Sequence, residues 1–195
     1  MEKVRNHQAA LLSTAVRLFQ EQGYHGTGLT QLLKESGAPK GSLYHHFPEG
    51  KEQIAAEAVA QAAHGIELMA ASVIAKAESG PAAVTDFAKR LANWFKGTGY
   101  RAGCPVTAVL LDTVPSSPLT TQACSQAFTS WIDVWANCFE NHGLEAHRAL
   151  ELAQLWVAGL EGAWIMARSQ QSTAPFIAVG RMFARQLKLP RINDQ

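Results

Sequence analysis

Charged side chains are scarce in this sequence and almost balanced, so no global electrostatic field draws the molecule onto nucleic acid. Of its 195 residues, 17 are Lys or Arg and 16 are Asp or Glu, which leaves a net charge of +1. The first 51 residues hold six basic and four acidic side chains, an excess too small to indicate DNA binding. Function therefore has to be inferred from local patterns.

Cysteine and long apolar runs are rare as well. The three cysteines are an odd number without CxxC spacing, which predicts reduced, packed thiols and no disulfide framework. The polar N-terminus lacks the apolar segment of a signal peptide. The longest nearly apolar stretch, residues 155–167, contains Glu161 and is too short to span a bilayer. We therefore expect a cytoplasmic protein that does not contact a membrane.

Known catalytic signatures are missing too. The sequence has no GxSxG, no glycine-rich phosphate loop, no HExxH and no Cys/His set at metal-binding spacing. We accordingly expect no catalytic residues, no metal site and no cofactor, which argues against an enzyme.

Helical periodicity is present almost everywhere, and strand-like alternation never persists. A first helix, for example, has one apolar stripe, formed by Leu11, Ala15, Leu18 and Phe19. A second helix is expected to bury Leu29, Leu32 and Leu33. Glycine and proline separate the segments. The pattern predicts an all-α fold of about nine helices, at 4–22, 29–36, 40–47, 51–77, 82–97, 104–113, 118–142, 145–171 and 174–188.

Residues 23–47 are the most informative segment. Two short helices separated by Gly37 and Pro39 have the layout of a helix-turn-helix, whose second helix presents its N-terminal residues to the major groove. Leu43 and Phe47, four residues apart, would form its inward face. The outward positions are then Lys40, Gly41, Ser42, Tyr44, His45 and His46.

These outward residue types suit DNA. Lys40 can donate to guanine or to a phosphate, and the hydroxyl and imidazole groups suit phosphate oxygens. Lys51 adds a positive charge at the start of the next helix, where anions are favoured. Paired short helices with a polar surface also occur in proteins that do not bind DNA, so spacing alone leaves both interpretations open.

The run from Gly37 to Phe47, GAPKGSLYHHF, resembles the recognition-helix signature of the TetR family of bacterial repressors. With its flanking residues this resemblance covers about residues 8–60. The segments starting at Gly103 (GCPV) and Leu160 (LEGA) are similar to the ligand-binding half of the LmrA/YxaF-like branch. The resemblance implies a three-helix DNA-binding head at residues 1–50 and a ligand-binding and dimerisation domain at residues 51–195.

The resemblance also assigns DNA-contacting residues. It implies that Thr27 and Gly28 lie near the DNA backbone, at the start of the second helix. The family usually has Ser or Thr where Gly28 stands, so one capping or phosphate-binding hydroxyl is missing here. The implied set of DNA contacts is Thr27, Gly28, Lys40, Gly41, Ser42, Tyr44, His45, His46 and Lys51.

The last two helices favour a homodimer. Large and small apolar residues alternate over residues 152–166, and the final helix is apolar on more than one side. A monomer needs only one apolar stripe, so the excess suggests burial against a second copy, although a helix buried inside a monomer would look similar. The expected interface residues are Leu152, Trp156, Gly159, Leu160, Ala163, Phe176, Met182 and Phe183.

Aromatic residues at helical spacing in the same half can line a cavity for a planar effector or simply fill the core. Asp112, Asp133 and Glu161 are acids in apolar segments and need partners, which solvent or structural ion pairs also provide. Cys104 precedes Pro105 at a helix start, where a thiolate is favoured, although a packed thiol fits equally. The candidate ligand-binding residues are Trp94, Cys104, Phe128, Trp131, Trp135 and Glu161.

The resulting hypothesis is a ligand-responsive repressor that binds a pseudo-palindromic double-stranded DNA operator as a homodimer. A small hydrophobic or aromatic effector would release it. Two alternatives are a helical small-molecule-binding protein with a vestigial DNA-binding head and a helical enzyme acting on a hydrophobic substrate. Both alternatives predict that function survives the loss of Lys40 or Tyr44.

Overall fold

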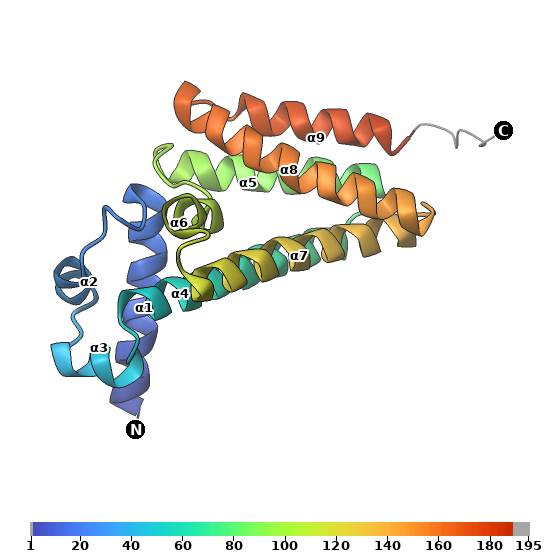
Figure 1. Cartoon of the computed structure of the whole chain (residues 1–195). Coiled ribbons are helices and arrows are strands. Elements are labelled where there is room, and N and C mark those ends of the chain that lie inside the picture. Colours follow the sequence, from blue (N-terminus) through green and yellow to red (C-terminus); the bar gives the residue numbers. More distant parts are fainter. Residues whose placement is uncertain (1, 189–195) are drawn as a thin grey trace. The chain divides into compact units, whose positions relative to one another are not determined.

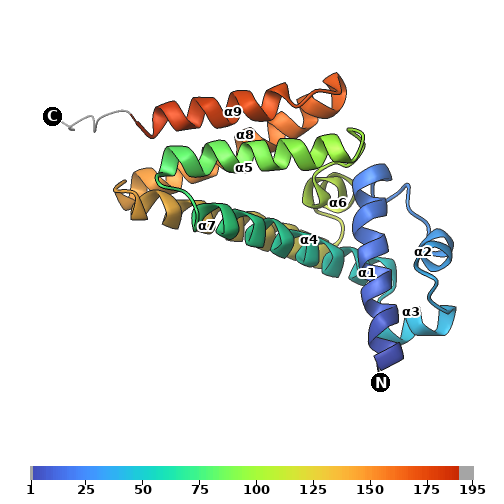
Figure 2. The ribbon, with the colours of Figure 1, turned by 180° about the vertical axis from the view of Figure 1, so that it is seen from behind.

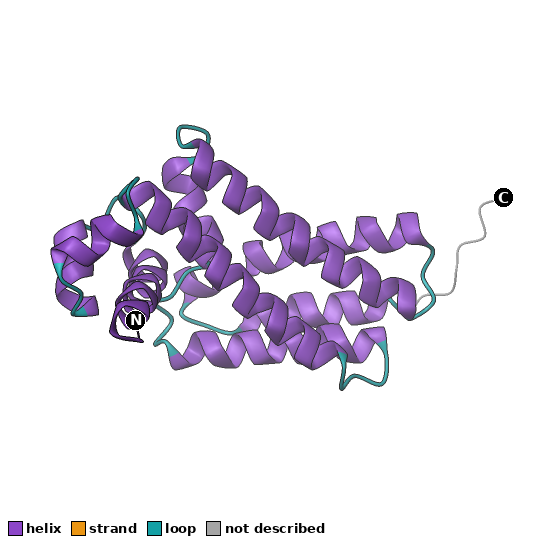
Figure 3. Cartoon of the chain, turned by 90° about the horizontal axis from the view of Figure 1, so that it is seen from below, coloured by secondary structure: helices purple, strands orange, loops and turns teal. Residues whose placement is uncertain are grey.

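The computed structural model describes residues 2–188, with side chains from residue 7 onward, and all regular elements in this range are helices (Figures 1 and 3). The helices are α1 (Glu2–Gln22), α2 (Leu29–Ser36), α3 (Lys40–His46), α4 (Lys51–Ile74), α5 (Gly80–Gly97), α6 (Pro105–Thr113), α7 (Pro118–Asn141), α8 (Ala146–Gln170) and α9 (Ala174–Gln186). The predicted all-α fold is confirmed, with helix boundaries within a few residues of those expected.

Two boundaries differ for identifiable reasons. Helix α5 begins at Gly80, before the predicted start, because the Ser79 hydroxyl accepts a hydrogen bond from the Ala82 amide at 3.3 Å and caps the helix. Helix α4 ends at Ile74, before the predicted end. Its last turn tightens there, since Lys76 and Ala77 donate to carbonyls three residues back, at 3.1 and 3.2 Å.

The chain folds into two compact units. The first contains residues up to 66 together with 101–130, and the second contains residues 67–100 together with those from 131 onward. Helices α4 and α7 each contribute residues to both units.

The first unit is built around α1. Leu11, Ala15, Leu18 and Phe19 are buried, as the periodicity predicted, and α1 packs against α2, α3 and α6 (Figure 2). Its last turn also accepts a backbone hydrogen bond from the segment before α6, from the Gly103 amide to the Gln20 carbonyl at 2.8 Å. In α2 only Leu32 is fully buried. Leu29 and Leu33 are half-buried, because this short helix is covered on one side only.

The second unit has an aromatic core. Helix α9 lies against α5 and α8, as Figures 1 and 2 show from opposite sides. Trp156 of α8 packs edge-on against Trp135 of α7 and Phe183 of α9, with ring centroids 5.3 and 5.1 Å apart, and Phe87 of α5 meets Trp135 at 5.1 Å. Such edge-to-face pairs add stabilisation beyond their buried area.

The three cysteines are buried and form no disulfide. Burial raises the pKa of Cys124 and of Cys138 to about 11, so both thiols are neutral around pH 7. Cys104 occupies the N-cap position of α6, as predicted, and is buried as well. Within residues 2–188, no helix is long and apolar enough to cross a membrane.

Candidate nucleic-acid interface

The turn between α2 and α3 is set by one glycine and one proline. Gly37 ends α2 with φ of 68°, a left-handed conformation that favours glycine. Pro39 precedes α3 with φ of −68° and ψ of 149°, so it takes the extended N-cap position, one residue before the first helical position at Lys40. The predicted helix-turn-helix layout is therefore present.

Helix α3 has a buried face and an exposed face. Leu43 and the adjoining Phe47 have no exposed surface, and the Phe47 amide donates to the Leu43 carbonyl at 2.8 Å. The other side chains lie on the opposite face: Lys40, Gly41, Tyr44 and His45 are exposed, and Ser42 and His46 are half-buried. Tyr44 exposes 51% of its surface, unusual for an aromatic residue, so α3 presents a polar and aromatic row to its surroundings.

Gly41 and His46 differ in how closely the rest of the protein packs around them. A Cβ atom at Gly41 would meet nothing within 4 Å, so the protein's own packing does not require glycine there. The His46 ring instead lies edge-on to His45 and Phe47, and its Nε2 atom is buried without a hydrogen-bond partner. Gln53 donates to the backbone carbonyl of His46 at 3.3 Å, which ties the end of α3 to α4.

Thr27, which the resemblance places near the DNA backbone, has a fully buried side chain. Its Oγ1 donates to the Gly23 carbonyl at 2.8 Å and accepts from Gln22 Nε2 at 3.3 Å. Thr27 therefore closes the turn between α1 and α2, and its proximity to the DNA backbone stays a prediction. Gly28 is exposed at the N-cap of α2 and provides no side-chain cap.

Lys51 begins α4, as predicted, but its side chain is partly covered. The Nζ atom lies 4.1 Å from the centroid of the Tyr24 ring, a cation–π arrangement. Burial lowers the pKa of Lys51, and the Asp112 carboxylate acts in the opposite direction. The ammonium group is thus held in place by its own protein before any DNA arrives.

A polar network that the sequence did not reveal joins α1 to α2. Arg17 forms an ion pair with Glu35 and a second with Glu21 at 3.4 Å, and Gln31 donates to Glu35 at 2.9 Å. The hydrogen bond from Gln31, followed by that from Arg17, lowers the pKa of Glu35. The sequence shows the four-residue spacings of Arg17 with Glu21 and of Gln31 with Glu35, but not the ion pair from Arg17 to Glu35 between the two helices.

Asp112, near the end of α6, connects α6 to the turn after α1. Its carboxylate accepts a hydrogen bond from the His25 amide at 2.9 Å, and the His25 ring Nε2 lies 3.0 Å from the Asp112 carbonyl oxygen. At Gly23, where φ is 77°, a Cβ atom would lie 3.0 Å from the same carboxylate. The acid in an apolar segment therefore has a partner in the head, and glycine permits the close approach.

Replacing Asp112 by alanine is expected to lower the free energy of unfolding by about 1 kcal/mol, because the His25 amide loses a charged acceptor. Asp112→Asn retains an acceptor oxygen and should lose about half as much. Urea titration measures both, with Asp133→Ala, an exposed acid on α7, as the control. Equal losses for Asp112→Ala and Asp133→Ala would contradict this role of Asp112.

Two protein-family models match the chain. Residues 11–58 match the model of bacterial regulatory proteins of the tetR family, and residues 81–182 match the C-terminal domain of LmrA/YxaF-like transcriptional regulators. The chain belongs to the TetR family. The HTH-type transcriptional regulator LmrA of Bacillus subtilis (strain 168) is 36% identical over 178 residues, covering 91% of this chain and 95% of that protein. YxaF of the same strain is 38% identical over 170 residues, covering 87% and 88%.

Solved structures agree with the fold. A TetR-family regulator from Cytophaga hutchinsonii matches with a TM-score of 0.82 at 17% identity, covering 100% of this chain and 99% of that one. Reduced NemR of E. coli matches with a TM-score of 0.79 at 22% identity, covering 93% and 95%. This chain is thus a DNA-binding transcriptional regulator with the all-α TetR-family architecture. Helix α6 lies within the segment that matches the C-terminal domain.

The predicted ligand-binding residues of this TetR-family regulator fall in both compact units. Cys104 and Phe128 belong to the first, and Trp94, Trp131, Trp135 and Glu161 belong to the second. Trp131 and Trp135 are buried, whereas Trp94 is partly exposed and packs against Trp164 at 5.8 Å. None of the six lines the surface hollow between α5 and α9.

Several residues expected at the dimer interface lie inside one protomer. Leu152, Trp156, Leu160 and Ala163 of α8 and Phe176 of α9 are buried in the second unit. They occupy the sides of the two helices that face the protomer's own core, and their place in a dimer interface stays a prediction.

The other expected interface residues lie at or near the surface. Gly159 and Phe183 are half-buried and pack together, since a Cβ atom at Gly159 would lie 3.6 Å from the Phe183 ring. Met182 is 63% exposed. Leu155 and Met166 of α8, which lie in the apolar segment 152–166 but were not among the expected interface residues, are 60% and 53% exposed. We call the following exposed set the α8–α9 face: Leu155, Ala158, Gly162, Met166, Ala178 and Met182.

Proposed function

We propose that this TetR-family regulator is a cytoplasmic repressor that binds a pseudo-palindromic operator as a homodimer. Residues 1–50 bind DNA, and residues 51–195 bind a second copy and a small effector. The exposed row of Lys40, Gly41, Tyr44 and His45 on α3 carries this proposal. Buried Leu43 and Phe47 hold the helix from behind, as docking of a recognition helix in the major groove requires.

DNA contact is proposed for Lys40, Gly41, Ser42, Tyr44, His45, His46 and Lys51, and for the exposed backbone at Gly28. Lys40, at the N-terminus of α3, suits a guanine or a phosphate, and Tyr44 lies one turn further along the same face. Lys51 must leave the Tyr24 ring, or bind phosphate from beside it, so its contribution is smaller than that of a fully solvated lysine.

The effector is proposed to be a small hydrophobic or aromatic molecule that binds the second unit. The aromatic core there supports this class of ligand. The Trp156 indole Nε1 is buried without a hydrogen-bond partner among the described residues, so it can donate to an acceptor on such a ligand. The effector must bind more tightly to the conformation that does not fit the operator, because a ligand with equal affinity for two conformations does not shift the equilibrium between them.

Selection of bound sequences from a random DNA pool, repeated over a salt series, tests the proposal directly. We expect a pseudo-palindromic consensus and an affinity that falls steeply with salt as counterions are released. Half-site centres should lie about one DNA turn apart, roughly 34–36 Å or somewhat more. Recovery of no consensus even at low salt would overturn the repressor function and favour a small-molecule-binding protein with a vestigial head.

A further inference from the structure

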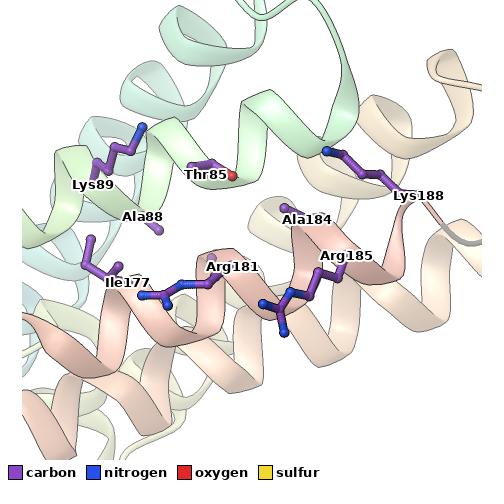
Figure 4. Close-up of a pocket in the computed structure, with 9 residues that line it drawn as sticks. Thr85, Ala88, Lys89, Ile177, Arg181, Ala184, Arg185 and Lys188 are labelled. Carbon is purple, nitrogen blue, oxygen red and sulfur yellow. The ribbon is translucent and has the colours of Figure 1, made fainter.

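A surface hollow lies along the contact between α5 and α9, on a part of the second unit that the proposed function does not use. The two helices approach closely at Gly180, where a Cβ atom would lie only 2.6 Å from the Cβ atom of Ala88. Beside this crossing the hollow has a volume of about 370 Å³ (Figure 4). We call it the α5–α9 hollow. Its size is at the lower end of the range for small-molecule sites.

Positive charge is concentrated around this hollow. Lys89 of α5 and Arg181, Arg185 and Lys188 at the other helix line it, and none of its described lining residues is acidic (Figure 4). The three from Arg181 to Lys188 recur at spacings of four and three, which places them along one side of the helix and its final turn. Like charges at this spacing repel one another, and the whole chain carries a net charge of only +1.

Internal ion pairs and the helix dipole account for only part of this cluster. Lys89 pairs with Asp86 at 3.1 Å on its own helix, and both side chains are more than half exposed. Among the described residues, Arg181, Arg185 and Lys188 have no ion-pair partner. The partial negative charge at the carbonyl end of α9 stabilises the positive charges of Arg185 and Lys188. Neither Arg181 nor Lys89 lies in the last turn of its helix.

The floor of the hollow is apolar. Ala88, Ile177 and Ala184 line it between the cationic side chains. A guanidinium group binds carboxylate or phosphate with two parallel hydrogen bonds, whereas apolar side chains bind hydrocarbon. The combination suits a small molecule with one anionic end and one apolar end better than it suits an inorganic ion.

The hollow and the α8–α9 face use different residues of α9. Ile177, Gly180 and Arg181 line the hollow, whereas Ala178 and Met182 belong to the α8–α9 face.

We propose that the α5–α9 hollow is a binding site for a small organic anion, a phosphate or carboxylate ester or acid with an apolar portion. The anionic group is held by Lys89 and Arg181, which line the hollow from opposite helices, and the apolar portion lies on Ala88 and Ile177. This site is separate from the aromatic core proposed for the effector, and its test does not depend on the DNA-binding function.

Isothermal titration of the full-length protein with phenyl phosphate tests the site, with inorganic phosphate and phenol as partial ligands. We expect saturable binding of one phenyl phosphate per chain, weaker binding of inorganic phosphate and none of phenol. The double variant Lys89→Gln/Arg181→Gln should weaken phenyl phosphate binding at least about tenfold, because it removes one lining cation from each helix. The matched control Arg90→Gln/Lys96→Gln removes the same charge from exposed positions of α5 and should stay within about twofold.

A second readout locates the ligand without any substitution. Phenyl phosphate should shift the NMR methyl signal of Ile177 in the wild-type protein and leave that of Ile165, on α8, unchanged. Absence of saturable binding, or an equal loss in both double variants, would overturn the proposal. So would binding of a long polyanion such as heparin without phenyl phosphate, which would indicate a macromolecular surface. Operator binding by Lys89→Gln/Arg181→Gln should be unchanged. A failure of the proposed anion site can therefore be told apart from a failure of the proposed repressor function.

Discussion

The double variant Leu155→Glu/Met166→Glu is expected to be monomeric and to bind the selected operator at least about a hundredfold more weakly than the wild-type protein. Both side chains are more than half exposed in one protomer and belong to the α8–α9 face. Leu155 and Met166 are eleven residues apart, about three helical turns, so they lie on one side of α8. Glutamate at both positions places two pairs of like charges in the proposed two-fold interface, where apolar surface would otherwise be buried.

The loss of affinity follows from the loss of the second head. In a dimer, binding of one recognition helix raises the effective concentration of the other at the second half-site, which strengthens binding about 10²–10⁴-fold without a new contact. Analytical ultracentrifugation measures the oligomeric state, and fluorescence anisotropy with operator DNA measures the affinity. The variant should still bind non-specific DNA, because α3 itself is unchanged.

A control for charge and exposure is available in the same unit. Leu68→Glu/Leu150→Glu also replaces two exposed leucines by glutamate, one on α4 and one on a different side of α8. This variant should remain dimeric and bind the operator as the wild-type protein does. A dimeric Leu155→Glu/Met166→Glu protein, or an equal loss in the control, would place the protomer interface elsewhere.

The head could be predicted well from the sequence because its signals are local. Gly37 and Pro39 each impose a backbone conformation that ends or begins a helix, whatever the rest of the chain does. The four-residue spacing of Leu43 and Phe47 then decides which face of α3 is covered. The same locality explains why the helix boundaries agree with the periodicity.

Features that depend on distant partners could not be predicted. Asp112 and His25 are 87 positions apart, so no spacing rule connects them. The burial of Thr27 depends on a tight turn whose Gly23 carbonyl its hydroxyl satisfies, and the resemblance indicated only that Thr27 lies near the DNA backbone. Helix α8 carries apolar residues on two sides. Periodicity identified the helix but not which side faces the protomer's core, and that choice determines the proposed interface.

The double variant Lys40→Ala/Tyr44→Ala is expected to lose about a hundredfold in affinity for the selected operator, since each good base contact contributes about 1–3 kcal/mol of discrimination. Both side chains are exposed on α3, and truncating them leaves buried Leu43 and Phe47 in place, so the thermal stability should change little. The control Lys96→Ala removes an exposed positive charge from α5 and should leave operator affinity unchanged.

The single variants separate reading of bases from contact with phosphates. If Lys40 contacts a base, Lys40→Ala relaxes the consensus at one position of each half-site, whereas loss of a phosphate contact weakens all sequences alike and reduces the salt slope by about 1. Tyr44→Phe removes only the hydroxyl, so an affinity close to that of Tyr44→Ala would indicate that Tyr44 acts as a hydrogen-bond donor to phosphate. An unchanged affinity in Lys40→Ala/Tyr44→Ala, measured by anisotropy on the selected operator, would mean that α3 does not read the DNA.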